Sequence, residues 1–287
     1  MSEPVVVAVD GSESALRATR WAADEARRRG RALRIVHAYQ WPPVGGPTFA
    51  TFEANADVVR EAAESVVRAA AETIPDVACE TEIILGATVP MLRSVSERAA
   101  LMVLGSRGRG GFTGLLTGSV TVAMAAHGHC PVAVIRDEPP ADGPVVVGVD
   151  GSPASEGAIG FAFEEAALRG SELVAVLAWT DAVFPVGPDG VQYPVIDWTP
   201  FAEQADELLG ERLAGWTEKY PEVVVRRRIE RDRPAAALLD AAKGAQLLVV
   251  GSRGRGGFAG LTLGSVSQAM LHHAPCPVVV ARPDQGH

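Results

Sequence analysis

The sequence contains one glycine- and arginine-rich stretch twice. "GSRGRGGFTGLLTGSV" begins at Gly105, and "GSRGRGGFAGLTLGSV" begins 146 positions later at Gly251, with 13 of 16 residues identical. Each copy follows a short apolar run and precedes a segment of helical composition. A glycine-rich turn from a strand into a helix presents free backbone N–H groups and the positive end of the helix dipole, and both attract phosphate. The repeat therefore predicts two anion sites, one in each half.

Glycine, serine and arginine each suit a phosphate site for a different reason. Glycine lets the backbone approach a ligand that a Cβ would keep away, serine adds a hydroxyl donor, and arginine adds charge-assisted hydrogen bonds. The predicted contacts are Gly105, Arg107, Gly108, Gly118 and Ser119, then Gly251, Arg253, Gly254, Gly264 and Ser265, with Arg109 and Arg255 as further cations. Two alternatives stay open, namely a plain loop with a helix cap and a solvated basic turn.

The motif "VDGS" also occurs twice and places Asp10 and Asp150 after the first predicted strand of each half. A carboxylate at this position can accept both hydroxyls of a ribose, as acids do in dinucleotide-binding folds. If the strand order reverses between the first and fourth strands, Asp10 and Gly105 flank one crevice. The alternative is that each aspartate only caps the following turn through its side chain.

Two histidine- and cysteine-containing segments, "HGHC" at 127–130 and "HHAPC" at 272–276, raise the question of a metal site. A tetrahedral site needs four convergent ligands, whereas these residues fall at a helix end that runs into a predicted buried strand. Histidines at a helix C-terminus and cysteines that pack as small apolar residues explain the pattern more simply. We therefore predict no metal site formed by these residues.

The residues between the motifs alternate between strand and helix patterns. In the first half, strands are predicted at 5–9, 33–38, 79–85, 101–104 and 132–135, and helices at 12–29, 55–73, 89–99 and 118–127. Gly30 is the expected C′ residue of the first helix, and in the second half Ser152 is the expected N-cap, followed by Pro153. Parallel strands require crossover helices, so the pattern predicts an α/β fold with two tandem, open, twisted five-stranded parallel sheets and helices on both faces.

The valine-rich fifth strand is a predicted sheet edge, and an unpaired apolar edge tends to pair with another strand. We expect Val132–Ile135 to pair antiparallel with Val278–Ala281 and to join the halves. The predicted domains are residues 1–138 and 144–287, with a proline-containing linker at 139–143. Further homodimerisation is also expected.

Composition limits the classes of partner. The net charge of −9 argues against broad binding to nucleic acid or an anionic membrane, since both require a cationic surface. The sequence has no run of the roughly 18 apolar residues that span a bilayer. Three cysteines without a framework spacing indicate a reducing compartment, so a cytoplasmic location is expected.

The quoted motifs resemble those of a tandem universal stress protein of the ATP-binding subclass. The family's pattern is glycine, two residues, glycine, nine residues, glycine and serine or threonine, and both halves match it, from Gly105 and from Gly251. The resemblance implies strand order 3-2-1-4-5, ATP with Mg²⁺ as the ligand, ribose contacts from Asp10 and Asp150, and adenine contacts from the main chain near His37 and Leu177. It adds Val9, Ala38 and Val120 in the first half and Val149, Ala178 and Val266 in the second.

The predicted function is ATP binding in a regulatory role in stress adaptation, with adenine nucleotide and an unidentified regulatory protein as partners. The chain has no P-loop lysine, so the sequence assigns no catalytic residue. A slow ATP hydrolase or nucleotide-dependent transferase, and a nucleotide-free dimerisation scaffold, remain alternatives. The aromatic residues within 183–198 fit either a lid over the second nucleotide or a surface loop. Thr117 precedes Gly118 whereas Leu263 precedes Gly264, so the two sites are expected to differ in affinity.

Overall fold

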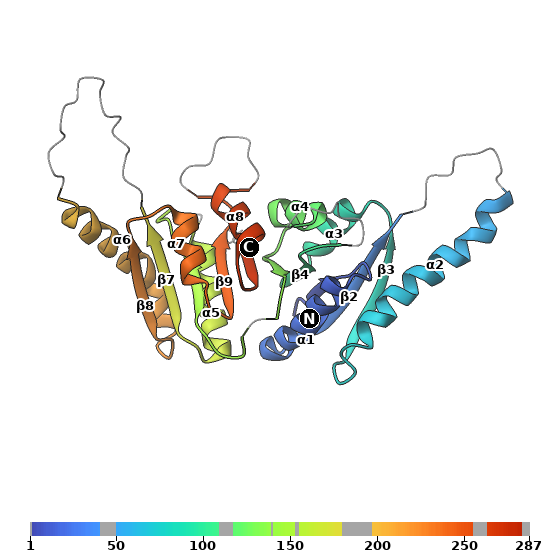
Figure 1. The fold of residues 1–287 in the computed structure, drawn as a ribbon. Helices are drawn as coiled ribbons and strands as arrows, with labels where there is room; N and C mark the ends of the chain where they lie inside the picture. Colours follow the sequence, from blue (N-terminus) through green and yellow to red (C-terminus); the bar gives the residue numbers. More distant parts are fainter. Residues whose placement is uncertain are drawn as a thin grey trace, which may run out of the picture.

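The computed structural model describes residues 2–40, 50–108, 117–138, 140–152, 155–179, 197–254 and 263–282. Two halves of the same α/β architecture lie side by side, with β-strands in the middle and helices on either face (Figure 1). Helices α2 and α6 lie at the two far ends of this arrangement, and α4 and α8 lie near its centre.

The first half alternates strands and helices as predicted. Its elements are β1 (Val5–Ala8), α1 (Glu13–Arg29), β2 (Leu33–Tyr39), α2 (Ala50–Ala71), β3 (Cys79–Leu85), α3 (Thr88–Ser96), β4 (Leu101–Gly105), α4 (Ser119–His127) and β5 (Val132–Ile135). The strands at 79–85 and 132–135 have the predicted bounds, and the other elements shift by a few residues at their ends.

The second half repeats this order. Its elements are β6 (Val145–Gly148), α5 (Glu156–Arg169), β7 (Leu173–Ala178), α6 (Thr199–Lys219), β8 (Val225–Glu230), α7 (Pro234–Ala241), β9 (Leu247–Gly251), α8 (Ser265–His273) and β10 (Val278–Ala281). The central strands are short runs of β-branched residues buried on both faces, as is typical of parallel sheets.

The ten strands form one continuous sheet in the order β3-β2-β1-β4-β5-β10-β9-β6-β7-β8. Within each half this is the predicted order 3-2-1-4-5, with parallel neighbours. The halves join through the predicted antiparallel pair, with Val134 opposite Val278 and Val132 opposite Val280. This pairing covers the β5 edge with a strand of the same chain, as predicted. Homodimerisation stays a prediction.

Each face of the sheet has its own hydrophobic core. The first core packs α1, α2, α5 and α6 on one face, with Phe163 and Leu209 fully buried. The second core packs α3, α4, α7 and α8 on the other face, with Met124 and Met270 fully buried. Alternate strand residues divide between the cores, as the period of two requires: Val5 faces the first core and Val6 faces the second.

Helix termini explain why α1 and α5 start differently. Ser12 caps α1, because its side chain accepts a hydrogen bond from the Ala15 N–H, and α1 ends at the predicted Gly30 in the left-handed conformation. The prediction that Ser152 caps the equivalent helix is wrong. The Ser152 hydroxyl donates to Asp150 Oδ1 instead, and α5 begins only at Glu156. Pro153 lies outside the described residues.

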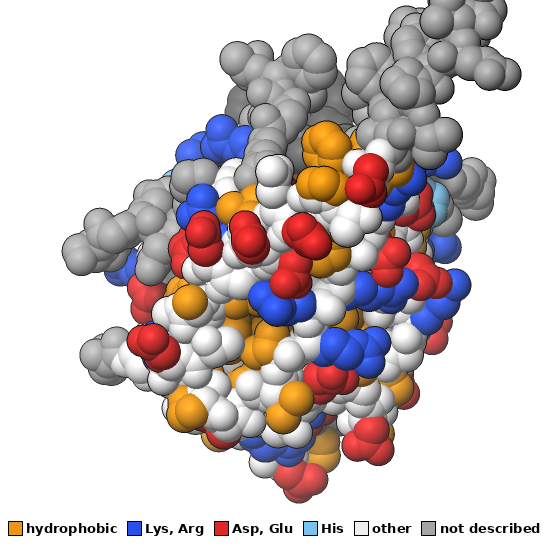
Figure 2. All heavy atoms as spheres, turned by 90° about the vertical axis from the view of Figure 1, so that its left-hand side faces the viewer, with side chains coloured by type: hydrophobic (Ala, Val, Ile, Leu, Met, Phe, Trp, Pro, Cys, Tyr) orange, Lys and Arg blue, Asp and Glu red, His pale blue; other side chains and the backbone are white. Residues whose placement is uncertain are grey.

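The outer strand β8 contains three consecutive arginines, and two of them form ion pairs. Arg227 pairs with Asp206 at 3.1 Å, and Arg228 pairs with Glu230 and with Asp240. Figure 2 faces this side of the molecule and shows basic and acidic side chains interspersed over α6 and β8. Charged residues on an edge strand discourage edge-to-edge association.

The two halves also meet through a buried group of four charges, called here the quartet: Glu25 and Arg29 of α1 with Glu165 and Arg169 of α5. Glu25 accepts from Arg29 at 2.6 Å and from Arg169 at 2.7 Å, and Glu165 pairs with both arginines. Each side chain is at most 4% exposed. Arg29 stacks over Phe161 and Arg169 over Trp21, at 4.8 and 5.8 Å from the ring centroids.

Ionisation differs between the two carboxyl groups of the quartet. Burial and the neighbouring Glu165 raise the pKa of Glu25 to about 7. Burial also opposes ionisation of Glu165, but Arg169 and Arg29 outweigh it and lower the pKa of this group. The pair therefore takes up a proton near neutral pH, and we place that proton on Glu25.

Candidate functional site

The residues predicted to flank a crevice meet at the switch point of each half. β1 is paired with β2 on one side and with β4 on the other, so the connections leave β1 and β4 in opposite directions. Asp10 follows β1 and Gly105 ends β4, which brings both to the carboxyl edge of adjacent parallel strands. Ligands bind at such points in open α/β sheets. Asp150 and Gly251 occupy the same places beside β6 and β9.

Each aspartate faces a glycine of the repeated stretch. A Cβ added to Gly108 would lie less than 3.0 Å from Asp10 Oδ2, and one added to Gly254 less than 3.0 Å from Asp150 Oδ2. Any other residue at 108 or 254 would displace the carboxylate or the loop. In both halves the fold therefore brings the aspartate predicted to bind ribose against the loop predicted to bind phosphate.

Asp10 and Asp150 also cap the turn that follows them through their side chains, which was the alternative role for these residues. Asp10 Oδ1 accepts from the Ser12 N–H at 3.0 Å, and Asp150 Oδ1 accepts from the Ser152 N–H at 3.0 Å. One oxygen of each carboxylate therefore shapes the turn, while the other lies against the glycine loop. The capping contact and a place in the crevice are compatible.

The N-termini of α4 and α8 present backbone amides at the crevice. Gly118 and Gly264 occupy the N-cap positions, where no side chain caps the helix. The first N–H groups of a helix have no partner within it, so these amides are suited to an anion. Ser119 and Ser265 follow directly and are exposed, so their hydroxyls can add donors.

Hydrogen bonds hold the two ends of each glycine loop together. The Gly118 N–H donates to Ser106 O at 2.8 Å, and the Thr121 hydroxyl donates to Gly105 O at 2.9 Å. The second half repeats both bonds, from Gly264 to Ser252 O at 2.8 Å and from Ser267 to Gly251 O at 2.6 Å. Sequence reasoning missed Thr121 and Ser267, although their recurrence at equivalent positions was a usable signal.

Arginines gather beside both loops. Arg107 and Arg253 are exposed, whereas Arg109 and Arg255 lie outside the described residues. Burial, and then the nearby charge of Arg107, lower the pKa of Arg136, which follows β5. Burial also lowers the pKa of Arg282 after β10, with Arg253 and Arg93 adding repulsion. The charge of Arg107 thus acts on Arg136, and that of Arg253 on Arg282, so each loop has two arginines close enough to repel each other.

Among the described residues, the first loop has two serine contacts without a counterpart at the second. The Ser12 hydroxyl donates to Arg107 O at 3.2 Å, and the Ser14 hydroxyl accepts from the Arg107 N–H at 3.3 Å. In the second half the Ser152 hydroxyl turns to Asp150, and alanine replaces serine at position 154. The two crevices therefore share their backbone frame but differ in how side chains hold the loop.

The predicted adenine contacts end β2 and β7. Ala38 pairs with Ile84, and Ala178 pairs with Glu230. The predicted contact Val9 accepts at its carbonyl a 2.7 Å contact from His37 Nδ1, while leucine replaces histidine at the equivalent position 177. Val149 donates its N–H to Val176 O at 2.9 Å. The carboxyl ends of β2 and β7 therefore lie at the same sheet edge as Asp10 and Asp150, because β2 and β7 run parallel beside β1 and β6.

Aromatic residues follow Ala178 in the second half. Trp179, Trp198 and Phe201 lie with ring centroids 5.5–6.2 Å apart, and Arg231 stacks over Trp198 at 4.3 Å. Of the segment 183–198, for which we expected a lid or a surface loop, residues 183–196 lie outside the described residues. Trp198 from its end packs on Trp179, the residue after the predicted adenine contact.

The residue before each Gly-Ser pair faces away from the crevice. Thr117 is buried, and its hydroxyl donates to Leu271 O of α8 in the other half at 2.8 Å. Leu263 is buried in the second core. The difference between these positions therefore acts at the junction of the halves, and the structure places neither side chain as a direct phosphate contact.

The histidine and cysteine segments do not gather into a site. In the part of the chain that the structure describes, no group of three or more His, Cys, Asp or Glu residues could hold a metal ion. Cys130 and Cys276 are buried before β5 and β10, and burial raises the pKa of each thiol to about 12. Both cysteines are therefore protonated and pack as small apolar residues.

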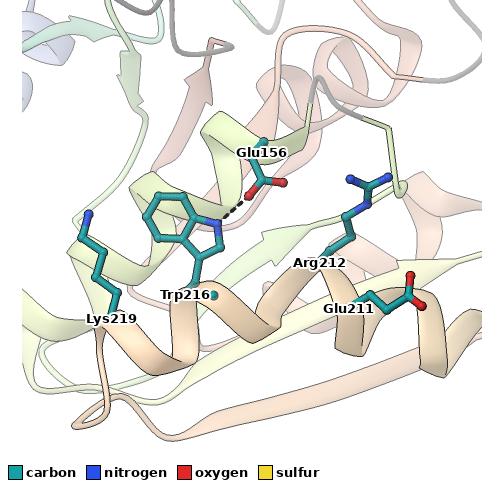
Figure 3. Close-up of a pocket in the computed structure, with 6 residues that line it drawn as sticks. Glu156, Glu211, Arg212, Trp216 and Lys219 are labelled. Atoms are coloured by element: carbon teal, nitrogen blue, oxygen red, sulfur yellow. Dashed lines mark hydrogen bonds between the residues drawn. The ribbon is translucent and has the colours of Figure 1, made fainter.

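A surface hollow of about 510 Å³ lies between α5 and α6 (Figure 3). Its lining residues are Glu156, Glu211, Arg212, Gly215, Trp216 and Lys219. Trp216 Nε1 donates to Glu156 at 2.7 Å, and Lys219 lies over the Trp216 ring at 5.0 Å. Since none of the predicted nucleotide contacts lines it, we interpret this hollow as a packing groove between two helices.

Comparisons with known proteins agree with this architecture. The model of the universal stress protein family matches residues 1–136 and 143–282. Universal stress protein Rv2005c of Mycobacterium tuberculosis is 41% identical over 98% of this chain and 99% of its own length. The crystal structure of a universal stress protein from Archaeoglobus fulgidus covers 99% of both chains with a TM-score of 0.69 at 21% identity.

A universal stress protein solved in complex with cAMP aligns with 50% of this chain and 100% of its own, at 26% identity and a TM-score of 0.35. None of the helices in the described ranges is long and apolar enough to cross a membrane. The duplicated sheet, the two matched regions and the full-length relatives lead to one conclusion: the chain belongs to the universal stress protein family.

Proposed function

We propose that each half binds one ATP molecule and that the bound nucleotide is a regulatory ligand. One observation carries the proposal: in both halves a carboxylate after the first strand lies against a glycine of the loop that opens an uncapped helix N-terminus. The carboxylates of Asp10 and Asp150 would accept the ribose hydroxyls, and the amides after Gly118 and Gly264 would bind phosphate. Main chain at Ala38 and Ala178 would contact adenine.

The cations and hydroxyls at the loops fit a triphosphate with Mg²⁺. Arg107 and Arg253 are exposed beside the loops and would neutralise phosphate charge. The hydroxyl oxygens of Ser119 and Ser265 are hard donors of the kind Mg²⁺ accepts together with phosphate oxygens. A bound Mg²⁺ would reduce the repulsion among the phosphates. We also propose that the nucleotide biases the conformation of the chain or its choice of a protein partner.

Two measurements test this proposal. Protein denatured directly after purification should release adenine nucleotide, detected by chromatography, and nucleotide-free protein should bind about two equivalents of ATP by calorimetry with Mg²⁺ present. Gly108→Ala and Gly254→Ala should each weaken one site by about 1–3 kcal/mol, because the added Cβ displaces the facing carboxylate.

Gly215→Ala is the matched control, since a Cβ there meets nothing within 4 Å. Gly215 lies inside α6, where alanine should leave ATP affinity unchanged and stabilise the fold by about 0.5–1 kcal/mol. Wild-type protein that releases no nucleotide and gives no heat with ATP would refute the proposal. Equal affinities in the wild type and both crevice variants would remove the glycine loops from the site.

A further inference from the structure

Helix α8 of the second half ends against the loop of the first crevice. The carbonyl of Leu271, in the last turn of α8, accepts from the Thr117 hydroxyl at 2.8 Å and from Arg136 Nη2 at 2.8 Å. The last carbonyls of a helix have no partner within it, so they are free to accept from other elements. Two donors from the first half therefore converge on one carbonyl of the second half.

Both donors are connected to the phosphate loop of the first crevice. Thr117 directly precedes Gly118, whose N–H donates to Ser106 O at 2.8 Å and closes the loop. The Arg136 carbonyl accepts from Arg17 Nε of α1 at 3.1 Å. α1 begins at the turn that contacts Arg107. A shift of Leu271 would therefore reach the loop along two routes.

The second crevice has only part of this arrangement. Arg282 Nη2 donates to Ala125 O of α4 at 3.2 Å, which is the counterpart of the Arg136 bond. The residue equivalent to Thr117 is Leu263, whose side chain has no hydrogen-bond donor. The residue equivalent to Arg17 is Gly157, which has no side chain to bind the Arg282 carbonyl. In the described part of the chain, Arg282 Nε is buried without a hydrogen-bond partner. The first loop is thus fixed to the opposite half more firmly than the second.

We infer that the second half completes the first nucleotide site, with Thr117 and Arg136 as positioning residues that hold its phosphate loop on α8. The inference rests on the proposed function, since it concerns the affinity of that same site. Neither residue needs to touch the nucleotide: both fix the distance between the loop and the helix N-terminus that bind it. The first site should therefore lose affinity when the contact to Leu271 is removed, and the second should not.

The test uses the full chain and ATP with Mg²⁺. In the Asp150→Ala background, where the second site is disabled, calorimetry should show about three- to tenfold weaker binding for Thr117→Val than for the background alone, as expected when one hydrogen bond is lost. Thr117→Ser keeps the hydroxyl and should restore affinity. Leu263→Val changes a buried side chain at the equivalent position and should leave the first site unchanged.

A second readout reports loop position directly. Amide hydrogen exchange of nucleotide-free protein should be faster at 105–108 and 117–121 in Thr117→Val, and unchanged at 251–254 and 263–267. In the Asp10→Ala background, Thr117→Val should leave second-site affinity at its background value. Arg136→Met should weaken the first site in the same way, because it removes the second donor to Leu271.

The outcomes separate the two proposals. Wild-type protein that binds no ATP overturns the proposed function and this inference with it. Wild-type protein that binds ATP, together with full affinity in both Thr117→Val and Arg136→Met, overturns only the inference. Equal weakening of both sites by Thr117→Val would show general loosening of the chain, and it would also overturn the inference.

Discussion

The halves meet on both faces of the sheet, and the two contacts differ in symmetry. On the face of α1 and α5 the contact is nearly symmetric: Glu25 and Glu165, Arg29 and Arg169, and the rings of Trp21 and Phe161 occupy equivalent positions. On the face of α4 and α8 it is not, because two donors bind Leu271 O whereas one binds Ala125 O. The symmetric contact buries charge far from the loops, and the asymmetric contact touches them.

This difference indicates how a duplicated chain can hold its halves together and still separate their sites. A buried ion-pair group tolerates change poorly, because removing one partner leaves an uncompensated charge. Equivalent residues in both halves are therefore expected where the halves share the group. A single hydrogen bond from a loop contributes much less to the stability of the fold than this buried ion-pair group does. Its absence from one half is therefore tolerated.

The largest expected effect comes from breaking the quartet. Arg29→Met or Arg169→Met should lower the free energy of unfolding by about 3–5 kcal/mol, since each leaves two buried carboxyl groups with only one arginine between them. Arg28→Met is the matched control: Arg28 is 37% exposed and lies 3.9 Å from Glu25, so its loss should cost less than about 0.5 kcal/mol. Urea unfolding measures all three, and a loss confined to one of the two buried arginines would contradict the symmetry.

The pH dependence of stability should reveal which carboxyl of the quartet carries the proton. Because the pKa of Glu25 is raised to about 7, the folded protein holds a proton that the unfolded chain releases above its ordinary pKa of 4.5. The contribution of Glu25 is therefore fully present below about pH 4.5 and is lost as pH rises through about 7. The difference in unfolding free energy between wild type and Glu25→Gln should change by about 1–3 kcal/mol between pH 5 and pH 8.

Subtracting the pH dependence of the unfolding free energy of Glu25→Gln from that of the wild type removes the contributions of the other titrating groups. His272 acts in the opposite direction, because burial and then the nearby charges of His273 and Arg136 lower its pKa. Glu165 stabilises the folded protein above its ordinary pKa of 4.5, and this stability is lost only as the pH falls below that value, outside the range from pH 5 to pH 8. A difference curve that is flat from pH 5 to pH 8 would show that Glu25 is ionised throughout, contrary to our assignment.

A comparison of one position in α1 and α5 tests where the symmetry between the halves ends on this face of the sheet. A Cβ added to Gly160 of α5 would lie less than 3.0 Å from the Trp216 ring of α6. Gly160→Ala should lower the free energy of unfolding by about 1–3 kcal/mol through overpacking. The equivalent position in α1 is Arg20, which is 47% exposed, and Arg20→Ala should change stability by less than about 0.5 kcal/mol. Equal effects of the two changes would refute this difference in packing.

Much of the fold was predictable because it depends on local patterns that occur twice. Valine-rich runs gave the strands, and the glycine at position 30 marked the end of α1. The valine-rich edge at 132–135 predicted the β5–β10 pair. The start of α5 was mispredicted, because the Ser152 hydroxyl donates to Asp150 and the helix begins only at Glu156, too far along the chain for Ser152 to be its N-cap.

The candidate crevices were predictable in part. The repeated motifs gave Asp10, Asp150 and the glycine loops, and the contacts at Gly108 and Gly254 bring these together. The role of Thr117 was not predictable. Its neighbours in sequence are loop residues, whereas its hydrogen-bond partner, Leu271, lies 154 positions away.

By itself the sequence determined the duplication, the alternation of strands and helices along the chain and the types of residue at each predicted site, since these follow from periodicity and spacing. The spatial order of the strands was an implication of the family resemblance. Only the tertiary structure decided which charges are buried together and which side chains link one crevice to the opposite half. Arg29 meets Glu165 and Thr117 meets Leu271 because β5 and β10 pair antiparallel, and that pairing sets the relative positions of helices that are distant in the sequence.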